Sequence, residues 1–270
     1  MLDQHLLNFI KSKSVGRIKT LSDMQSLGLF QYSKSETPNC YKVGWVKYSS
    51  EEEENRSPKI WQPEFGYYIN DIGFRGEYPS VDDKKILGFF GCSITFGEGL
   101  PEDDTYARLI SQHLNKKYLN LGITGVGCHR IALTFSAATR LWDIETAVVV
   151  LPRYTRFHYV DKGNHLHSIL LAYKMGLEEL ETVRLDILKH FSDQFLLSQT
   201  IDAIQWIIDI AKTKNINLVL ASWDDEMVQI INTAFDLDII TLETIDKARD
   251  GSHPGKASHK AFAEKVINTL

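Results

Sequence analysis

The chain has 270 residues, a net charge of −5, and 43% hydrophobic and 24% charged residues. This composition is typical of a globular protein with room for one large α/β domain. The mild charge and the lack of a Lys/Arg-rich run argue against a nucleic-acid partner. The apolar stretch within the first 20 residues is too short and too often interrupted for a signal peptide or a membrane span. We therefore expect a cytoplasmic protein with no membrane partner.

The three cysteines, Cys40, Cys92 and Cys128, are odd in number and widely spaced. They form no C-x-x-C pair, so the sequence predicts neither a disulfide framework nor a cysteine metal site. A reducing compartment suits such cysteines best. No metal or other cofactor is expected.

Residues 1–83 differ from the rest of the chain. They hold four of the seven prolines and few long periodic segments. They are predicted to form an irregular extension that packs on the core, with a short strand at 67–70 and a turn at 71–73.

Residues 84–270 show alternating strand and helix patterns. Strands are predicted at 86–90, 118–121, 147–151, 217–221 and 237–241, and helices at 104–114, 128–141, 167–176, 178–213 and 255–270. Trp206 and the isoleucines around it are expected in the core. The alternation predicts a three-layer α/β sandwich with a parallel, flavodoxin-like sheet of about five strands in the order 2-1-3-4-5. Ligands of such sheets bind beyond the carboxyl ends of the strands.

The first motif, Gly-Cys-Ser-Ile-Thr-Phe-Gly at 91–97, directly follows the first predicted strand. The strand end would expose the Ser93 hydroxyl at the carboxyl edge of the sheet, and the glycines allow a sharp turn. An ordinary glycine-rich turn, with Ser93 capping a helix, remains an alternative. The motif lacks the lysine and spacing of a phosphate-binding loop.

The second motif, Asp-Gly-Ser-His-Pro-Gly at 250–255, follows the last predicted strand. A nucleophilic serine needs a base, and the base needs an acceptor that orients it. His253 and Asp250 could supply both from one turn at the same sheet edge as Ser93. Alone, a D-x-x-H sequence is more often a capping turn with an exposed histidine.

The third motif, Asn-Leu-Gly-Ile-Thr-Gly-Val-Gly at 120–127, follows the second predicted strand. Its backbone N–H groups could stabilise an oxyanion in a site shared with the other two motifs. Taken alone, it is more often a flexible loop.

Together the three motifs resemble the SGNH (GDSL-like) hydrolase family, from about residue 67 to the end. The family's G-D-S-x-T-x-G, N-x-G-x-x-G-like and D-x-x-H-P blocks correspond here to Ser93, to Gly125, and to Asp250 with His253. The sequence at 70–76 also resembles an N-x-x-G-F-R-G stretch that precedes the serine block in some relatives. The resemblance implies that 84–270 is a hydrolase domain in which the backbone amides of Ser93 and Gly125 hold the oxyanion.

Two positions depart from the family pattern. Cys92 replaces the aspartate of G-D-S, which leaves a thiol nucleophile as a less favoured alternative to Ser93. After the third strand, the family's G-x-N-D block is absent, and with it an oxyanion asparagine. Losing one oxyanion donor typically costs about 100- to 1000-fold in rate. Arg153, Tyr154 or Thr155 could supply a donor or contact the substrate instead, with Arg153 the first choice.

Other polar residues carry weaker signals. His129 and Arg130 follow the glycine-rich loop, where a surface role at a helix start is favoured over a place in the site. The histidines His158, His165 and His167 show no clean metal-ligand spacing.

The resemblance predicts an esterase or deacetylase that acts through a Ser93–His253–Asp250 triad and an acyl-enzyme. Its substrate would be a small-molecule or carbohydrate ester, with O-acylated carbohydrate a plausible class. Two alternatives remain open, a carbohydrate O-acyltransferase and a non-catalytic binding or structural module. The sequence gives no oligomeric state.

Overall fold

A computed structural model describes residues 41–42, 66–70, 72–160, 166–171, 178–248 and 250–270. Its centre is a parallel five-stranded sheet in the order β4-β3-β5-β8-β9. In chain order this is 2-1-3-4-5, as predicted. The strands are β3 (Ile86–Gly91), β4 (Tyr118–Gly122), β5 (Ile144–Leu151), β8 (Asn217–Ser222) and β9 (Ile240–Thr241).

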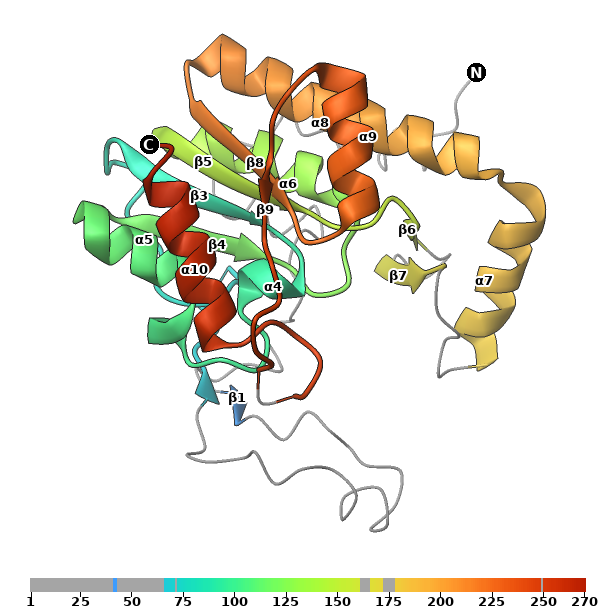
Figure 1. The fold of residues 1–270 in the computed structure, drawn as a ribbon, viewed down its shortest axis with the longest axis horizontal. Coiled ribbons are helices and arrows are strands. Elements are labelled where there is room, and N and C mark those ends of the chain that lie inside the picture. The colour runs from blue at the N-terminus through green and yellow to red at the C-terminus, as the bar shows by residue number, and fades with distance from the viewer. Residues whose placement is uncertain (1–40, 43–65, 71, 161–165, 172–177, 249) are drawn as a thin grey trace, which may run out of the picture.

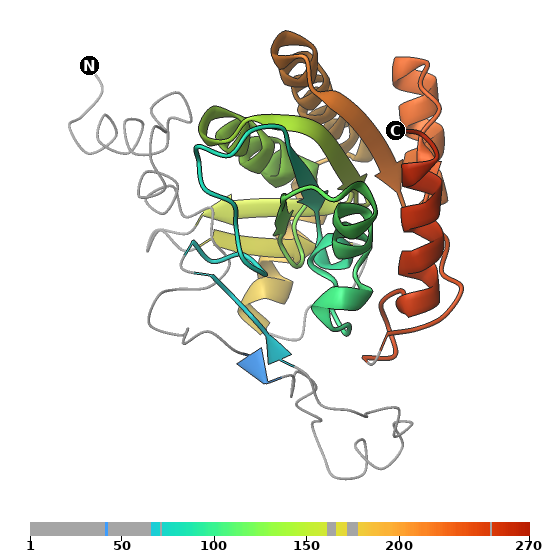
Figure 2. The same cartoon turned by 90° about the vertical axis from the view of Figure 1, so that its left-hand side faces the viewer.

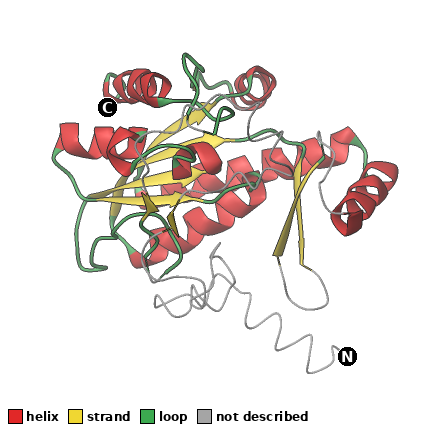
Figure 3. Cartoon of the chain, turned by 90° about the horizontal axis from the view of Figure 1, so that it is seen from below, coloured by secondary structure: helices red, strands yellow, loops and turns green. Residues whose placement is uncertain are grey.

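Helices cover both faces of this sheet, which makes the predicted three-layer sandwich (Figure 1). On one face α5 packs against α10, and on the other α6 packs against α8, while α9 contacts β8. The helices are α4 (Ser93–Phe96), α5 (Tyr106–Leu114), α6 (Cys128–Leu141), α7 (Glu178–His190), α8 (Asp193–Lys214), α9 (Asp225–Phe235) and α10 (Lys256–Ile267), with a 3-10 turn η2 (Glu102–Asp104). The view from below shows helices above and below the strands (Figure 3).

The central strands consist almost entirely of buried apolar residues, as expected for a parallel sheet covered on both faces. Ile204, Ile207 and Ile208 are buried in this core, as predicted, whereas Trp206 is only partly buried and packs against it. Among the described residues, no helix is long and apolar enough to span a membrane.

The prediction of a helix at 167–176 is wrong over its first residues. Leu166–Leu170 is a strand, β7, that pairs antiparallel with β6 (Arg156–Val160) in a separate two-stranded ribbon. Ile169 of β7 is fully buried in a second, small apolar cluster. Periodicity alone cannot separate a short strand from a helix here. Residues 172–177 lie outside the described part of the chain.

The expected helix at 178–213 is two helices, α7 and α8. The break is at Ser192, whose hydroxyl caps α8 by accepting a hydrogen bond from Phe195 N at 3.3 Å. The last strand is shorter than the predicted 237–241, because only Ile240 and Thr241 pair with β8.

Few of residues 1–83 are described. β2 (Gly66–Tyr67) pairs antiparallel with β1 (Tyr41–Lys42), as the second view shows (Figure 2). Ile69 then bridges Arg75 across a turn. Ile72 and Phe74 belong to the main core. The proposed boundary between 83 and 84 stays a prediction, and Cys40 lies outside the described residues.

Candidate active site

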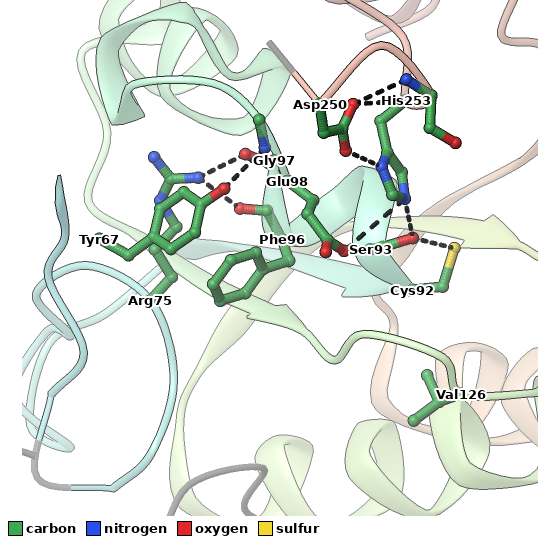
Figure 4. Close-up of polar contacts among 12 residues, drawn as sticks. Tyr67, Arg75, Cys92, Ser93, Phe96, Gly97, Glu98, Val126, Asp250 and His253 are labelled. Carbon is green, nitrogen blue, oxygen red and sulfur yellow. Dashed lines mark hydrogen bonds and ion pairs between the residues drawn. The ribbon is translucent and has the colours of Figure 1, made fainter. Parts of the chain in front are cut away.

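Three loops meet at the carboxyl edge of the sheet. One follows β3 and carries Ser93, one follows β4 and carries Gly125, and one follows β9 and carries Asp250 and His253. Ser93 is the first residue of α4, after the N-cap Cys92, and its side chain is buried. The close-up shows Ser93, His253 and Asp250 in a row (Figure 4).

Hydrogen bonds connect Ser93, His253 and Asp250. Ser93 Oγ lies 2.8 Å from His253 Nε2, and His253 Nδ1 is bonded to Asp250 Oδ2. Because the carboxylate can only accept, Nδ1 carries the ring proton and Nε2 is left to accept the Ser93 hydroxyl. This is the arrangement in which a histidine can act as general base toward a serine.

The turn that holds Asp250 is itself fixed. Asp250 Oδ1 accepts hydrogen bonds from the backbone N–H groups of Ser252 at 2.9 Å and His253 at 3.0 Å. Ala248 N donates to His253 O at 2.8 Å, and Lys247 Nζ donates to Ser252 O at 3.0 Å. The carboxylate and the imidazole are therefore oriented by backbone contacts within one short loop.

These contacts shift the pKa values of Asp250 and His253. Burial alone raises the pKa of Asp250, but the hydrogen bonds from the His253 ring and from two backbone N–H groups hold it below its usual range. Burial alone lowers the pKa of His253, whereas Asp250 and Glu98 raise it, and the net result is above the usual value. Asp250 is thus an anion and His253 a strengthened base.

The helix that carries Ser93 is held by the buried arginine of the Gly-Phe-Arg-Gly stretch, a residue to which the sequence alone assigns no role. Arg75 Nη1 donates to the carbonyls of Phe96 at 2.9 Å and Gly97 at 2.7 Å, and Nη2 donates to Leu100 O at 2.7 Å. The guanidinium also lies 4.6 Å from the ring centre of Tyr67. It satisfies carbonyls at the end of α4 that the helix itself leaves unpaired. The G-F-R-G signal thus marks a residue that supports the site.

The glycine-rich loop is positioned by a close approach of β4 to α4. Gly122 has no room for a side chain, because a Cβ there would lie 2.2 Å from Phe96 N. Gly122 N donates to Asn120 Oδ1 at 3.1 Å. Gly125 has a φ of 75°, in the left-handed region that favours glycine. The loop lies beside α4, and its role as an oxyanion donor stays a proposal.

The three residues suggested as replacements for the missing asparagine have other contacts. Arg153 Nε is paired with Asp224 Oδ2 at 2.5 Å, and its guanidinium lies 5.6 Å from the Trp223 ring. Tyr154 packs against both apolar clusters. Thr155 O accepts a hydrogen bond from Leu171 N at 3.0 Å.

Arg156, which sequence analysis did not select, lies nearer the charged groups of the site. Its Nη1 donates to Val126 O, next to Gly125, at 3.2 Å. Its positive charge lowers the pKa values of both Glu98 and His253.

Cys92 and Cys128 are buried and unoxidised. Cys92 Sγ lies 3.9 Å from Ser93 Oγ. Burial raises the pKa of the Cys128 thiol to about 12, which keeps it protonated.

The other histidines and Arg130 lie in different environments. At the start of α6, His129 is exposed as expected, whereas Arg130 is buried, so the expected surface role is wrong for Arg130. His165 and the side chains of His158 and His167 lie outside the described part of the chain. His259, which the sequence did not single out, accepts a hydrogen bond from Tyr106 N at 3.1 Å, and burial lowers its pKa to about 3. It is a neutral link between α10 and α5.

Among the described residues, Glu98, Asp250 and His253 bring carboxylate and imidazole atoms close together, but the ring nitrogens are already engaged, so we assign no metal site to them. The carboxylate and imidazole atoms of the three residues lie within 4.8 Å of one another. An ion at His253 Nε2 would have to displace the Ser93 hydroxyl.

No known sequence family and no curated protein matches the chain. Its fold is similar to solved structures of low sequence identity. A protein assigned to the G-D-S-L lipolytic family from Desulfitobacterium hafniense has 14% identity and a TM-score of 0.47, covering 69% of this chain and 100% of that one. A carbohydrate esterase family 2 enzyme from Corynascus thermopiles (Myceliophthora fergusii) has 17% identity and a TM-score of 0.45, covering 76% and 71%. An SGNH-hydrolase family esterase has 15% identity and a TM-score of 0.39, covering 69% and 95%.

Proposed function

We propose that the protein is a serine hydrolase that cleaves carboxylic esters through an acyl-enzyme. The observation that supports this most directly is the 2.8 Å contact between Ser93 Oγ and His253 Nε2, with Asp250 on the opposite ring nitrogen. An unconnected serine and histidine would not need this alignment, nor an anionic carboxylate held by two backbone N–H groups.

In the proposed reaction, His253 Nε2 takes the Ser93 hydroxyl proton as Oγ bonds to the acyl carbon. Asp250 stabilises the imidazolium, and the backbone N–H groups of Ser93 and Gly125 donate hydrogen bonds to the negatively charged carbonyl oxygen. The imidazolium then protonates the leaving alcohol. A water molecule then gives a proton to His253 Nε2 as it attacks the acyl carbon. The proton returns to Ser93 Oγ as the bond between Oγ and the acyl carbon breaks, and the acid is released.

The substrate class follows from the sequence resemblance, which favours O-acylated carbohydrates, acetyl esters among them. Transfer of the acyl group to a sugar hydroxyl instead of water would use the same acyl-enzyme. The missing asparagine favours a weak enzyme, since one oxyanion donor is typically worth about 100- to 1000-fold in rate.

The test is active-site labelling with a fluorophosphonate, combined with hydrolysis of a short p-nitrophenyl ester. The wild-type protein should gain one adduct on Ser93, and Ser93→Ala should lose both labelling and hydrolysis. Ser252→Ala is the matched control, because Ser252 is an exposed serine in the loop that carries Asp250 and His253, and it should behave as wild type. An unlabelled, inactive wild-type protein would instead support the non-catalytic module.

A further inference from the structure

A second carboxylate faces the histidine of the site. Glu98 Oε2 lies 3.6 Å from His253 Nε2, the same nitrogen that bonds Ser93. Only 19% of the Glu98 side chain and 24% of the His253 side chain are exposed. The imidazole therefore has Asp250 on its Nδ1 side and Glu98 on its Nε2 side, as the close-up shows (Figure 4).

Glu98 is held in this place by its backbone. Gly97 ends α4 in the left-handed conformation, with φ 80°, which turns the chain back so that Glu98 N donates to Ser93 O at 3.0 Å. The next residue, Gly99, donates to Tyr67 Oη at 2.6 Å, and Arg75 holds the carbonyls before and after. A loop bonded on both sides gives the carboxylate a fixed position.

We propose that Glu98 is a positioning residue that stabilises the protonated form of His253 from the Nε2 side, opposite Asp250. The consequence for catalysis rests on the proposed function. As Ser93 Oγ bonds to the acyl carbon, its proton moves to Nε2, and the new positive charge lies within reach of the Glu98 carboxylate. Glu98 itself forms and breaks no covalent bond.

The other charged groups near the His253 ring have opposite effects on its pKa. Asp250 adds to the effect of Glu98, while Arg156, at the start of β6, opposes it. Tyr67 also faces Glu98, and its pKa, raised by burial to about 12, keeps it neutral. The buried and neutral His259 lies beyond them. Burial, with a smaller effect from the Asp250 charge, raises the pKa of Glu98 itself; the charges of His253 and Arg156 lower it, and the net result is above the usual value.

The sign of the expected pH effect follows from the charge. His253 must be neutral to act as a base, so kcat/KM falls as pH drops through its pKa. Glu98→Gln removes an anion beside the ring and lowers that pKa. The acid limb of kcat/KM should move to lower pH by about one unit, since an opposite charge within about 4–6 Å shifts a pKa by about 1–3 units and this pair is partly exposed. A purely structural role would lower kcat/KM equally at every pH.

Two further variants sharpen the test. Glu77→Gln removes the same charge from an exposed site and should leave the limb unchanged. Arg156→Gln removes the opposing cation and should move the limb to higher pH.

A measurement that needs no activity separates this proposal from the hydrolase assignment. The imidazole signal of His253 is titrated by NMR in Ser93→Ala and in Ser93→Ala/Glu98→Gln, and it is assigned by its loss in His253→Asn. A lower His253 pKa in the double variant supports the proposal even if no ester is cleaved. An unchanged pKa, with the fold intact, overturns it even if the enzyme is active.

Discussion

At the scale of single residues, the replacement for the family's asparagine can be tested directly. Arg153 was the first choice from sequence, yet its Nε is paired with a buried carboxylate, Asp224, which also caps α9 by accepting a hydrogen bond from Met227 N at 3.2 Å. A guanidinium engaged in this way is less free to follow a developing oxyanion.

We therefore predict that Arg153→Ala lowers kcat/KM for a short ester by less than about tenfold, well below the 100- to 1000-fold typical of an oxyanion donor. Steady-state kinetics checks this, with Tyr154→Phe and Thr155→Ala as companions. A loss of 100-fold or more in Arg153→Ala, without a loss of stability, would show that Arg153 does reach the reacting oxygen.

At the scale of secondary-structure elements, the position of Ser93 depends on the contact between β4 and α4. The three atoms nearest to a Cβ on Gly122 would all be backbone atoms of α4, Phe96 N at 2.2 Å and Phe96 Cα and Thr95 C at 2.7 Å each. Backbone cannot rotate away as a side chain can, so the helix itself must move.

Gly122→Ala should therefore displace α4 and lower kcat/KM by at least about 100-fold, since a misplacement of about 1 Å can cost that much. Gly88→Ala is the control from the neighbouring strand, where a Cβ would meet the side chains of Phe90 at 2.7 Å and Ile144 at 3.3 Å. It should cost about 1–3 kcal/mol in the free energy of unfolding and leave kcat/KM nearly unchanged. Equal activity losses in the two variants would contradict this account. Urea unfolding measures the free energy of unfolding, and ester hydrolysis measures kcat/KM.

The elements also show what the sequence could predict. The strands themselves followed from the alternating pattern, because buried parallel strands read as apolar runs, such as that ending at Leu151. Their order came from the analogy with flavodoxin-like sheets. β6 and β7 were not predicted, although Gly163 and Asn164 between them are typical residues of a hairpin loop. At the site, Ser93 and His253 carried recognisable motifs. Glu98 carried none, since its place depends on the left-handed turn at Gly97 that aims it at the ring.

At the scale of the whole molecule, the described residues divide their apolar side chains between two clusters. The larger joins the central sheet to its helices, and the smaller consists of Ile169, Leu171, Ile187 and Leu196 under the β6–β7 ribbon. The ribbon pairs only within itself, and an isolated two-stranded ribbon is marginally stable. Large apolar side chains beside it are exposed, namely Leu185, Leu188, Phe191 and Phe195.

We predict that the β6–β7 ribbon and the small apolar cluster beneath it open without global unfolding. Backbone amides of β6 and β7 should exchange hydrogen faster than those of β3 and β5, because local opening costs less free energy than unfolding the sheet. Two substitutions in the same helix, α8, test the division. Leu196→Ala removes a side chain of the small cluster and should speed exchange in β6 and β7 alone, whereas Ile204→Ala, in the main core, should destabilise the whole molecule by about 2–5 kcal/mol. If Leu196→Ala speeds exchange in β3 and β5 equally, the two clusters unfold as one unit. Arg156, at the start of β6, would then be held near Glu98 and His253 for as long as the sheet is folded.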